Sequence, residues 1–237
     1  MSAADWPDWV NQLKRMYLAG SSSFFILHGN VDDVVLSFEA GQSLLETLPD
    51  FLARRLFGGY DLVLHYDLGR GLRVHPGGDP ARLTRMNALL ERLTGQGANL
   101  PKDPTQVLRL LDRLVTLILV NAAGSRPLKA ALLFDYGEMI CPPGDQFDEH
   151  LAVFLNWARS PVVKRVNMVF ILLAHSLGGL HPLLVQSAHT AEIRVPMPEL
   201  ETRTRFIERL YPGADHALLG RLSSGLTLSN LDNFLRL

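Results

Sequence analysis

The sequence predicts an α/β fold in which helices cover both faces of an open, five-stranded, mostly parallel β-sheet. Five short segments have strand character, and most are continuous apolar runs, as expected for parallel strands buried on both faces. Segments with the apolar spacing of amphipathic helices lie between these runs. Because strands that alternate with helices imply parallel crossover connections, the sheet should lie between two layers of helices.

The predicted strands and helices alternate along most of the chain. The strands span residues 24–28, 60–68, 129–135, 166–174 and 191–196. The helices span residues 6–17, 51–57, 83–93, 107–120, 147–159, 199–211 and 214–224. Two helices have a clear start, because Asp79 and Asp103 each precede a proline. An acidic N-cap followed by proline at the first helical position is a common helix start.

The composition excludes several classes of protein. Among 237 residues, 47% are hydrophobic, and 23 Lys and Arg against 24 Asp and Glu give a formal net charge of −1. A dedicated nucleic-acid-binding protein would carry a basic excess. The acidic N-terminus is unlike a signal peptide, and the longest apolar run, residues 166–174, is far shorter than the roughly 20 residues that span a bilayer. The single cysteine, Cys141, excludes an internal disulfide, so we expect a cytoplasmic protein that binds neither membranes nor nucleic acids.

The pattern changes near residue 198. No strand signal follows the Pro-Met-Pro step at residues 196–198, and the remaining segments have helical spacing. We therefore expect an α/β core with an N-terminal helix over residues 1–198 and the start of a helical lid over residues 199–237. The sequence ends within a periodic segment without a C-cap glycine or a polar tail, which predicts that the lid is truncated and the natural chain longer.

The loop after the first strand is where a phosphate-binding loop would lie. Such a loop needs a second glycine five residues after Gly29, followed by Lys and then Ser or Thr. Residues 34–36 are Val, Val and Leu instead, and the carboxylates of Asp32 and Asp33 would repel phosphate oxygens. The sequence therefore predicts that a working phosphate loop is absent.

The third strand ends in an acidic residue, Asp135. An Asp at the tip of an apolar strand binds Mg²⁺ in nucleotide hydrolases, where the next residue is often the Glu that activates water. Here the next residue is Tyr136, and the nearest Glu is Glu138. Because Asp at a strand tip is also a common cap for the following loop, a purely structural role for Asp135 is an equal alternative.

The segment after the fourth strand supports an alternative function. Ala174-His175-Ser176-Leu177-Gly178 resembles the nucleophile elbow of α/β-hydrolases, with alanine in place of the first glycine. Ser176 would then be the nucleophile of a lipase- or esterase-like enzyme. Such an enzyme also needs an acid and a later histidine at strand ends, and no downstream histidine has that position. The hydrolase is therefore the alternative, and not the leading, interpretation.

The same region resembles the passage from sensor 1 to the lid in AAA+ ATPases. In that family a strand carries the sensor residue at its tip, the last core strand ends in an apolar-Pro-x-Pro step, and an Arg-bearing helix begins the lid. The corresponding features here are Ser176 or His175, residues 195–198, and Arg203. Residues 222–231 are similar to the Gly-x-(Ser/Thr)-x-x-Asp/Asn-Leu turn of the lid, whose hydroxyl caps the next helix.

The resemblance implies an AAA+-like, P-loop NTPase type of fold in a degenerate member of the superfamily. Asp135 stands at the Mg²⁺ position, Tyr136 replaces the catalytic Glu, and only Ser, Ala, His and Thr stand at residues 187–190, where an arginine finger is expected. Because the finger and the Glu each raise the rate by orders of magnitude, the resemblance implies a module without useful ATP turnover. Such a module would serve as a structural, oligomerisation or regulatory part of a larger AAA+ ATPase.

The expected site and partners follow from this interpretation. If a nucleotide binds, the candidate contacts are His28, Gly29, Asp135 and Ser176, and no residue is expected to be catalytic unless Ser176 is a hydrolase nucleophile. No cofactor is expected, with ATP and Mg²⁺ as the weaker alternative. The histidines lack metal-ligand spacing, so no metal site is expected. The expected partners are further copies of the chain, a following AAA+ module and other proteins.

Overall fold

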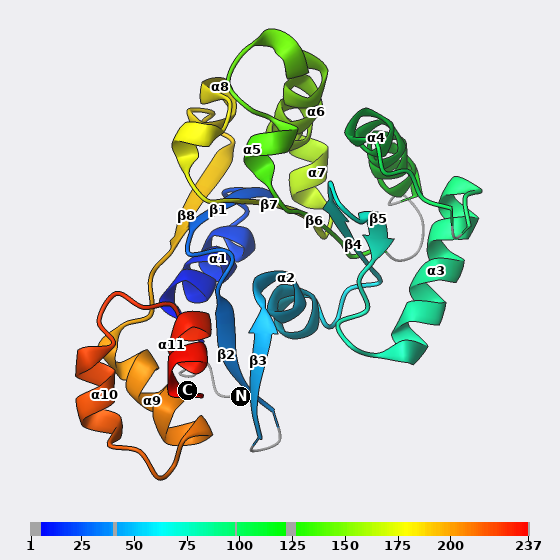
Figure 1. Cartoon of the computed structure of the whole chain (residues 1–237). Helices are drawn as coiled ribbons and strands as arrows, with labels where there is room; N and C mark the ends of the chain where they lie inside the picture. Colours follow the sequence, from blue (N-terminus) through cyan, green and yellow to red (C-terminus); the bar gives the residue numbers. More distant parts are fainter. Residues whose placement is uncertain (1–5, 40–41, 98, 122–126, 237) are drawn as a thin grey trace.

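The computed structural model describes residues 6–39, 42–97, 99–121 and 127–236. A six-stranded sheet with the order β5-β4-β6-β7-β1-β8 forms the centre of the molecule (Figure 1). Neighbouring strands are parallel except at one edge, where β5 pairs antiparallel with β4. The predicted fold class, an open and mostly parallel sheet between helices, is confirmed.

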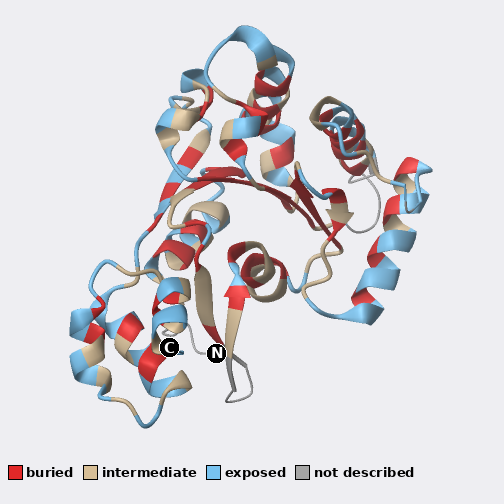
Figure 2. Ribbon diagram, viewed as in Figure 1, coloured by how far each residue is buried: buried red, intermediate tan, exposed pale blue. Residues whose placement is uncertain are grey.

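The strands of this sheet include all five predicted ones. Their bounds are β1 (Phe24–Gly29), β4 (Leu62–Asp67), β5 (Gly71–Val74), β6 (Ala130–Phe134), β7 (Met168–Ala174) and β8 (Thr190–Val195). Strands β6 and β7 are buried along their whole length (Figure 2). They lie in the middle of the sheet with helices over both faces, which explains why their sequences are continuously apolar.

The prediction of five strands is wrong at the β5 edge and in the loop after β1. Strand β5 is four residues long and contains Arg73, so it carries no apolar run that marks a strand. The loop after β1 contains a separate antiparallel hairpin of β2 (Val34–Glu39) and β3 (Gln42–Thr47). Residues 34–36, where a phosphate loop would have Gly, Lys and Ser or Thr, therefore lie in strand β2.

Each predicted helix is present, and the described residues form further helices outside the predicted ranges. Their bounds are α1 (Asp8–Leu18), α2 (Leu48–Phe51) with its π-helical continuation η2 (Leu52–Leu56), α3 (Pro80–Thr94), α4 (Pro104–Asn121), α5 (Gly137–Ile140), α6 (Asp148–Arg159), α7 (Pro161–Arg165), α8 (Pro182–Val185), α9 (Leu200–Leu210), α10 (His216–Leu222) and α11 (Leu228–Leu235). Short 3₁₀ turns precede α6 (Asp145–Phe147) and α8 (Leu177–Gly179). Asp79 caps α3 by accepting the N–H groups of Ala81 and Arg82, as predicted.

The two helical layers fix the carboxyl edge of the sheet. Helices α1 and α2 lie on one face and α4, α6 and α7 on the other (Figure 1). Trp157 of α6 stacks on Phe170 of β7 at 4.8 Å between ring centroids, and Phe154 contacts Phe134 of β6 edge-on at 5.3 Å. These rings are all buried, so β6 and β7 present the turns that follow them on a rigid support.

Helices α9, α10 and α11 gather around an apolar cluster of their own. Its buried members are Phe206, Ile207, Leu228 and Leu231, and Val34, Leu36 and Leu45 of the β2–β3 hairpin pack against them. The hairpin thus joins the C-terminal helices to the rest of the molecule. The division into residues 1–198 and 199–237 stays a prediction. None of the described helices combines the length and apolarity needed to cross a membrane.

Candidate functional site

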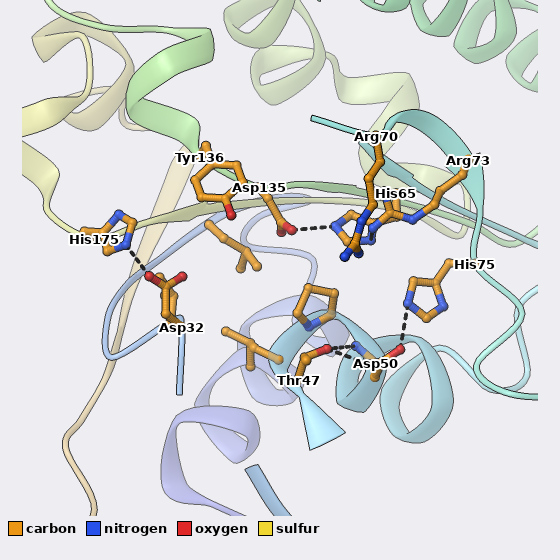
Figure 3. Close-up of a pocket in the computed structure, with 14 residues that line it drawn as sticks. Asp32, Thr47, Asp50, His65, Arg70, Arg73, His75, Asp135, Tyr136 and His175 are labelled. Carbon is orange, nitrogen blue, oxygen red and sulfur yellow. Dashed lines mark hydrogen bonds and ion pairs between the residues drawn. The ribbon is translucent and has the colours of Figure 1, made fainter. Parts of the chain in front are cut away.

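A cavity of about 300 Å³ lies at the carboxyl ends of the central strands (Figure 3). Open parallel sheets bind ligands beyond these strand ends. Its lining comes from the turns after β1, β6 and β7, from the start of α2, and from β4, β5 and the segment around them. The polar members are Asp32, Thr47, Asp50, His65, Arg70, Arg73, His75, Asp135, Tyr136 and His175.

His65 of β4 and Asp135, directly after β6, meet in this cavity. His65 Nε2 lies 2.8 Å from Asp135 Oδ2, and the His65 residue is 2% exposed. On the other side of the ring, Arg73 Nη2 lies 2.8 Å from His65 Nδ1. Because a guanidinium only donates, Nδ1 accepts, and the ring proton is carried on Nε2, facing Asp135.

Arg73 also affects whether His65 and its acidic neighbours can bind a metal ion. His65, Asp67 and Asp135 each offer a ligand atom, and these atoms lie within 4.8 Å of one another. Arg73 Nη1, however, lies 2.5 Å from Asp67 Oδ2, so its cation already pairs with that carboxylate. A ligating imidazole nitrogen must carry no proton, whereas Arg73 directs the proton of His65 to Nε2. The arrangement therefore opposes a metal ion in this cluster.

His175 connects three loops at the edge of the cavity. Its Nε2 lies 2.5 Å from Asp32 Oδ2 in the loop after β1, and its Nδ1 lies 3.5 Å from Glu138 Oε1 in α5. Glu138 also accepts the backbone N–H groups of His175 and Ser176. The hydrogen bond with Asp32 is the main cause that raises the pKa of His175 above its ordinary value, because a carboxylate favours the imidazolium form.

We expect the substitution Asp32→Asn to lower the pKa of His175. Since the folded-state pKa is raised, the pair stabilises the fold fully below the ordinary value of 6.5, and this contribution is lost as pH rises through the folded-state pKa. An NMR titration of the imidazole C–H signals in both proteins measures the change, with exposed His189 as the reference signal. Equal titration midpoints for His175 in the two proteins would contradict this assignment of the pair.

The start of α2 also faces the cavity and carries a negative charge. The Thr47 side chain caps the helix by accepting the N–H of Asp50. Asp50 Oδ1 lies 3.2 Å from His75 Nε2, and the hydrogen bond from His75 is the main cause that lowers the pKa of Asp50 to about 2. The carboxylate thus occupies the first turn of the helix, where the helix dipole would otherwise attract an external anion.

A second carboxylate of the loop after β1 lies at the start of α11. Asp33 Oδ2 accepts the N–H of Leu228 at 2.8 Å, and Oδ1 accepts the N–H and hydroxyl of Ser229 at 3.0 and 2.9 Å. Asn30 Nδ2 and the N–H of Val34 also donate to this carboxylate. Asp33 is 5% exposed. The N-terminus of α11, a ready anion site, is therefore filled by an acidic side chain of the core.

Comparison with known proteins identifies the family. A family model described as an AAA+ chaperone N-terminal Rossmann-like domain matches residues 2–196. The chain belongs to this family. No curated protein matches the sequence significantly. A chain in the structure of the HORMA:CdnC:Trip13 complex of E. coli MS115-1 is similar, with a TM-score of 0.50 and 15% sequence identity over 96% of this chain and 72% of that one, which shows likeness of fold.

In this AAA+ chaperone domain the predicted site residues separate into two groups. Asp135 lines the cavity, together with its neighbour Tyr136. Tyr136 has φ 56° and ψ 50°, a left-handed conformation that is rare for a bulky side chain. Gly137 follows, where a Cβ would lie 2.9 Å from Leu172 Cγ, so this turn is packed tightly against β7. The strained turn therefore lies after β6, and not at Ser176.

His28, Gly29 and Ser176 are not among the residues that line the cavity. A Cβ on Gly29, which has φ 102°, would lie 2.7 Å from the Val195 carbonyl oxygen, so this glycine permits the close approach of β1 and β8. Ser176 has the extended backbone φ −149°, and its Oγ accepts the N–H of Gly178 at 3.1 Å. The family membership and this capping role do not favour the hydrolase alternative.

Most of the basic side chains of the cavity are not among the residues predicted from the sequence. His65 lies within an apolar run, Arg70 and Arg73 lie in the β4–β5 hairpin, and His75 follows it. The one available signal was the alternation of polar residues at 65, 67, 73 and 75 around a turn, which is typical of a hairpin with one polar side.

Cys141 is buried, and burial raises the pKa of its thiol to about 12.

Proposed function

We propose that this AAA+ chaperone domain is a catalytically inert module that acts through protein contacts, as a structural or regulatory part of a larger AAA+ assembly. The observation that carries the proposal is the Asp33 carboxylate at the N-terminus of α11. A carboxylate of the chain itself thus occupies this helix N-terminus, a position that could otherwise attract a phosphate. The proposal includes no ATP or Mg²⁺ cofactor.

Two further features support an inert module. The β2–β3 hairpin stands where a phosphate loop would follow β1, and its apolar residues pack against the C-terminal helices. Tyr136 stands where AAA+ ATPases carry the water-activating Glu, and the nearby Glu138 is engaged with the backbone N–H groups of His175 and Ser176. A carboxylate used in this way is poorly placed to orient water.

The kind of partner follows from the family. A domain without turnover contributes by binding, and we propose that it packs against further copies, against a following AAA+ module or against other proteins, in the cytoplasm, without binding nucleic acid or membranes. The similar chain comes from a complex with the named proteins HORMA and CdnC, which supports protein partners. We expect the near-neutral charge to disfavour a polyanionic partner.

Two measurements on one sample test this function. Phosphate release from ATP with Mg²⁺ should equal the buffer blank, and light scattering coupled to size exclusion should give the same mass with and without ATP. The Asp135→Asn protein is the matched control, because any true turnover through this site needs that carboxylate. Release above the blank in the wild type that disappears in Asp135→Asn would contradict an inert module.

A further inference from the structure

The charged side chains that line the cavity have partners of opposite charge, with two exceptions. Asp32 pairs with His175, Asp50 with His75, and Arg73 with Asp67. Among the described residues, Asp135 and Arg70 have no partner of opposite permanent charge. One carboxylate and one guanidinium thus line the same cavity without forming an ion pair with each other.

Asp135 has a free acceptor in a buried position. Its Oδ1 is buried and accepts no hydrogen bond within the described part of the chain. His65 Nε2 is also buried and donates no hydrogen bond to a described residue. The 2.8 Å contact between His65 Nε2 and Asp135 Oδ2 therefore lacks the alignment of a good hydrogen bond. Because unsatisfied buried polar groups are costly, the Asp135 carboxylate favours a further cationic donor, which can approach its 21% exposed side chain from the cavity.

Arg70 supplies the positive end. Its backbone N–H donates to Asp67 Oδ1 at 2.7 Å, which fixes the turn between β4 and β5. Its guanidinium makes no hydrogen bond or ion pair with any described residue, and Figure 3 shows the side chain reaching into the cavity beside His65. A guanidinium in this position can bind a carboxylate through two parallel hydrogen bonds.

We propose that this cavity binds a small zwitterion, an amino acid or a dipeptide. The ammonium group pairs with the Asp135 carboxylate, whose side chain is 21% exposed, and the ligand carboxylate accepts from the Arg70 guanidinium. The volume of about 300 Å³ is at the lower end for small-molecule sites and suits a ligand of this size. The site goes beyond the proposed function and does not depend on it, since an inert module can hold a small ligand.

The rest of the lining selects against other ligands. A phosphate carries only negative charge, so it would leave the Asp135 carboxylate unpaired and repel it. The Arg73 cation and the Nε2 proton of His65 oppose a metal ion in the same place. A molecule with both charges leaves neither Asp135 nor Arg70 unpaired.

Isothermal titration calorimetry at pH 7 tests the site with each proteinogenic amino acid and with glycylglycine as probes. We expect at least one probe to bind with a Kd of roughly 1 mM or tighter, and its N-acetyl and amidated forms to bind at least about tenfold more weakly. Arg70→Gln and Asp135→Asn should each weaken binding by about tenfold or more. Arg85→Gln, which removes an exposed arginine outside the cavity, is the control and should bind as the wild type does.

Three outcomes would overturn the proposal. The first is that no probe binds even at a probe concentration roughly tenfold above the expected Kd. The second is binding that Arg70→Gln and Asp135→Asn leave unchanged, which places the ligand elsewhere. The third is binding of Zn²⁺ or Mn²⁺ that Asp135→Asn abolishes and Arg70→Gln does not affect, which makes the cluster a metal site. Because Arg70 is exposed, its variant should keep the fold, and circular dichroism checks both variants.

Discussion

Asp33→Asn should release helix α11 from the core. Both carboxylate oxygens of Asp33 only accept: Oδ2 faces Asn30 Nδ2 and the N–H of Leu228, and Oδ1 faces Val34 and Ser229 donors. In either orientation an asparagine would turn its NH₂ group toward two or more donors. The loss of the charged acceptor at a helix N-terminus should cost about 2 kcal/mol.

Amide hydrogen exchange measures this effect directly. The amides of Leu228 and Ser229 and the following turn should exchange roughly thirtyfold faster in Asp33→Asn, whereas the amides of β6 and β7 keep their protection. Asp32→Asn is the matched control, because Asp32 is adjacent in sequence but its side chain is 68% exposed and makes no hydrogen bond to α11. Equal exchange at α11 in all three proteins would show that Asp33 does not hold this helix.

Glu46→Ala should destabilise the protein by about 3 kcal/mol. Glu46 is 5% exposed and joins the hairpin to η2: Oε1 lies 3.1 Å from Arg54 Nε and Oε2 lies 3.3 Å from Arg55 Nε. The hydroxyl of Ser37 also donates to Oε2. The alanine variant removes the carboxylate that neutralises Arg55, whose side chain is only 10% exposed. Urea denaturation measures the loss in free energy of unfolding.

Glu201→Ala is the control for a surface ion pair. Glu201 lies 2.6 Å from Arg205 on α9, but its side chain is 75% exposed, so the pair should contribute less than about 0.5 kcal/mol. A Glu46→Ala protein as stable as Glu201→Ala would mean that the hairpin does not depend on the buried network, and that its position after β1 is held by apolar contacts alone.

The parts of the fold that could be predicted are those with a long local signal. Strands β6 and β7 are continuous apolar runs because both faces are covered, and α3 begins at an acidic cap followed by proline. Strand β5 has four residues, and the hairpin strands carry the buried polar residues Ser37 and Glu46. Short or polar strands of this kind depend on contacts with distant segments, which a sequence pattern does not contain.

The site residues also divide into those with a local sequence signal and those that depend on contacts between distant segments. Asp135 was predicted because a strand tip is recognisable from the sequence, and the absence of a phosphate-loop sequence was equally local. The Asp33 contacts with Leu228 and Ser229 join residues almost two hundred positions apart, with separations of 195 and 196. The hydrogen bond from Arg73 that places the ring proton of His65 on Nε2 depends on the β4–β5 pairing, which was not predicted. Such side-chain networks become visible only with the topology.

We propose that the chain itself occupies the phosphate-loop position after β1 and the N-terminus of α11. Isothermal titration calorimetry with ATP and Mg²⁺ tests it most directly, on the wild type and on Asp33→Ala, in which the carboxylate at the N-terminus of α11 is removed. We expect no binding heat for the wild type at ATP concentrations up to roughly 1 mM. Saturable binding of ATP to the wild type at micromolar concentration, with phosphate release, would contradict it.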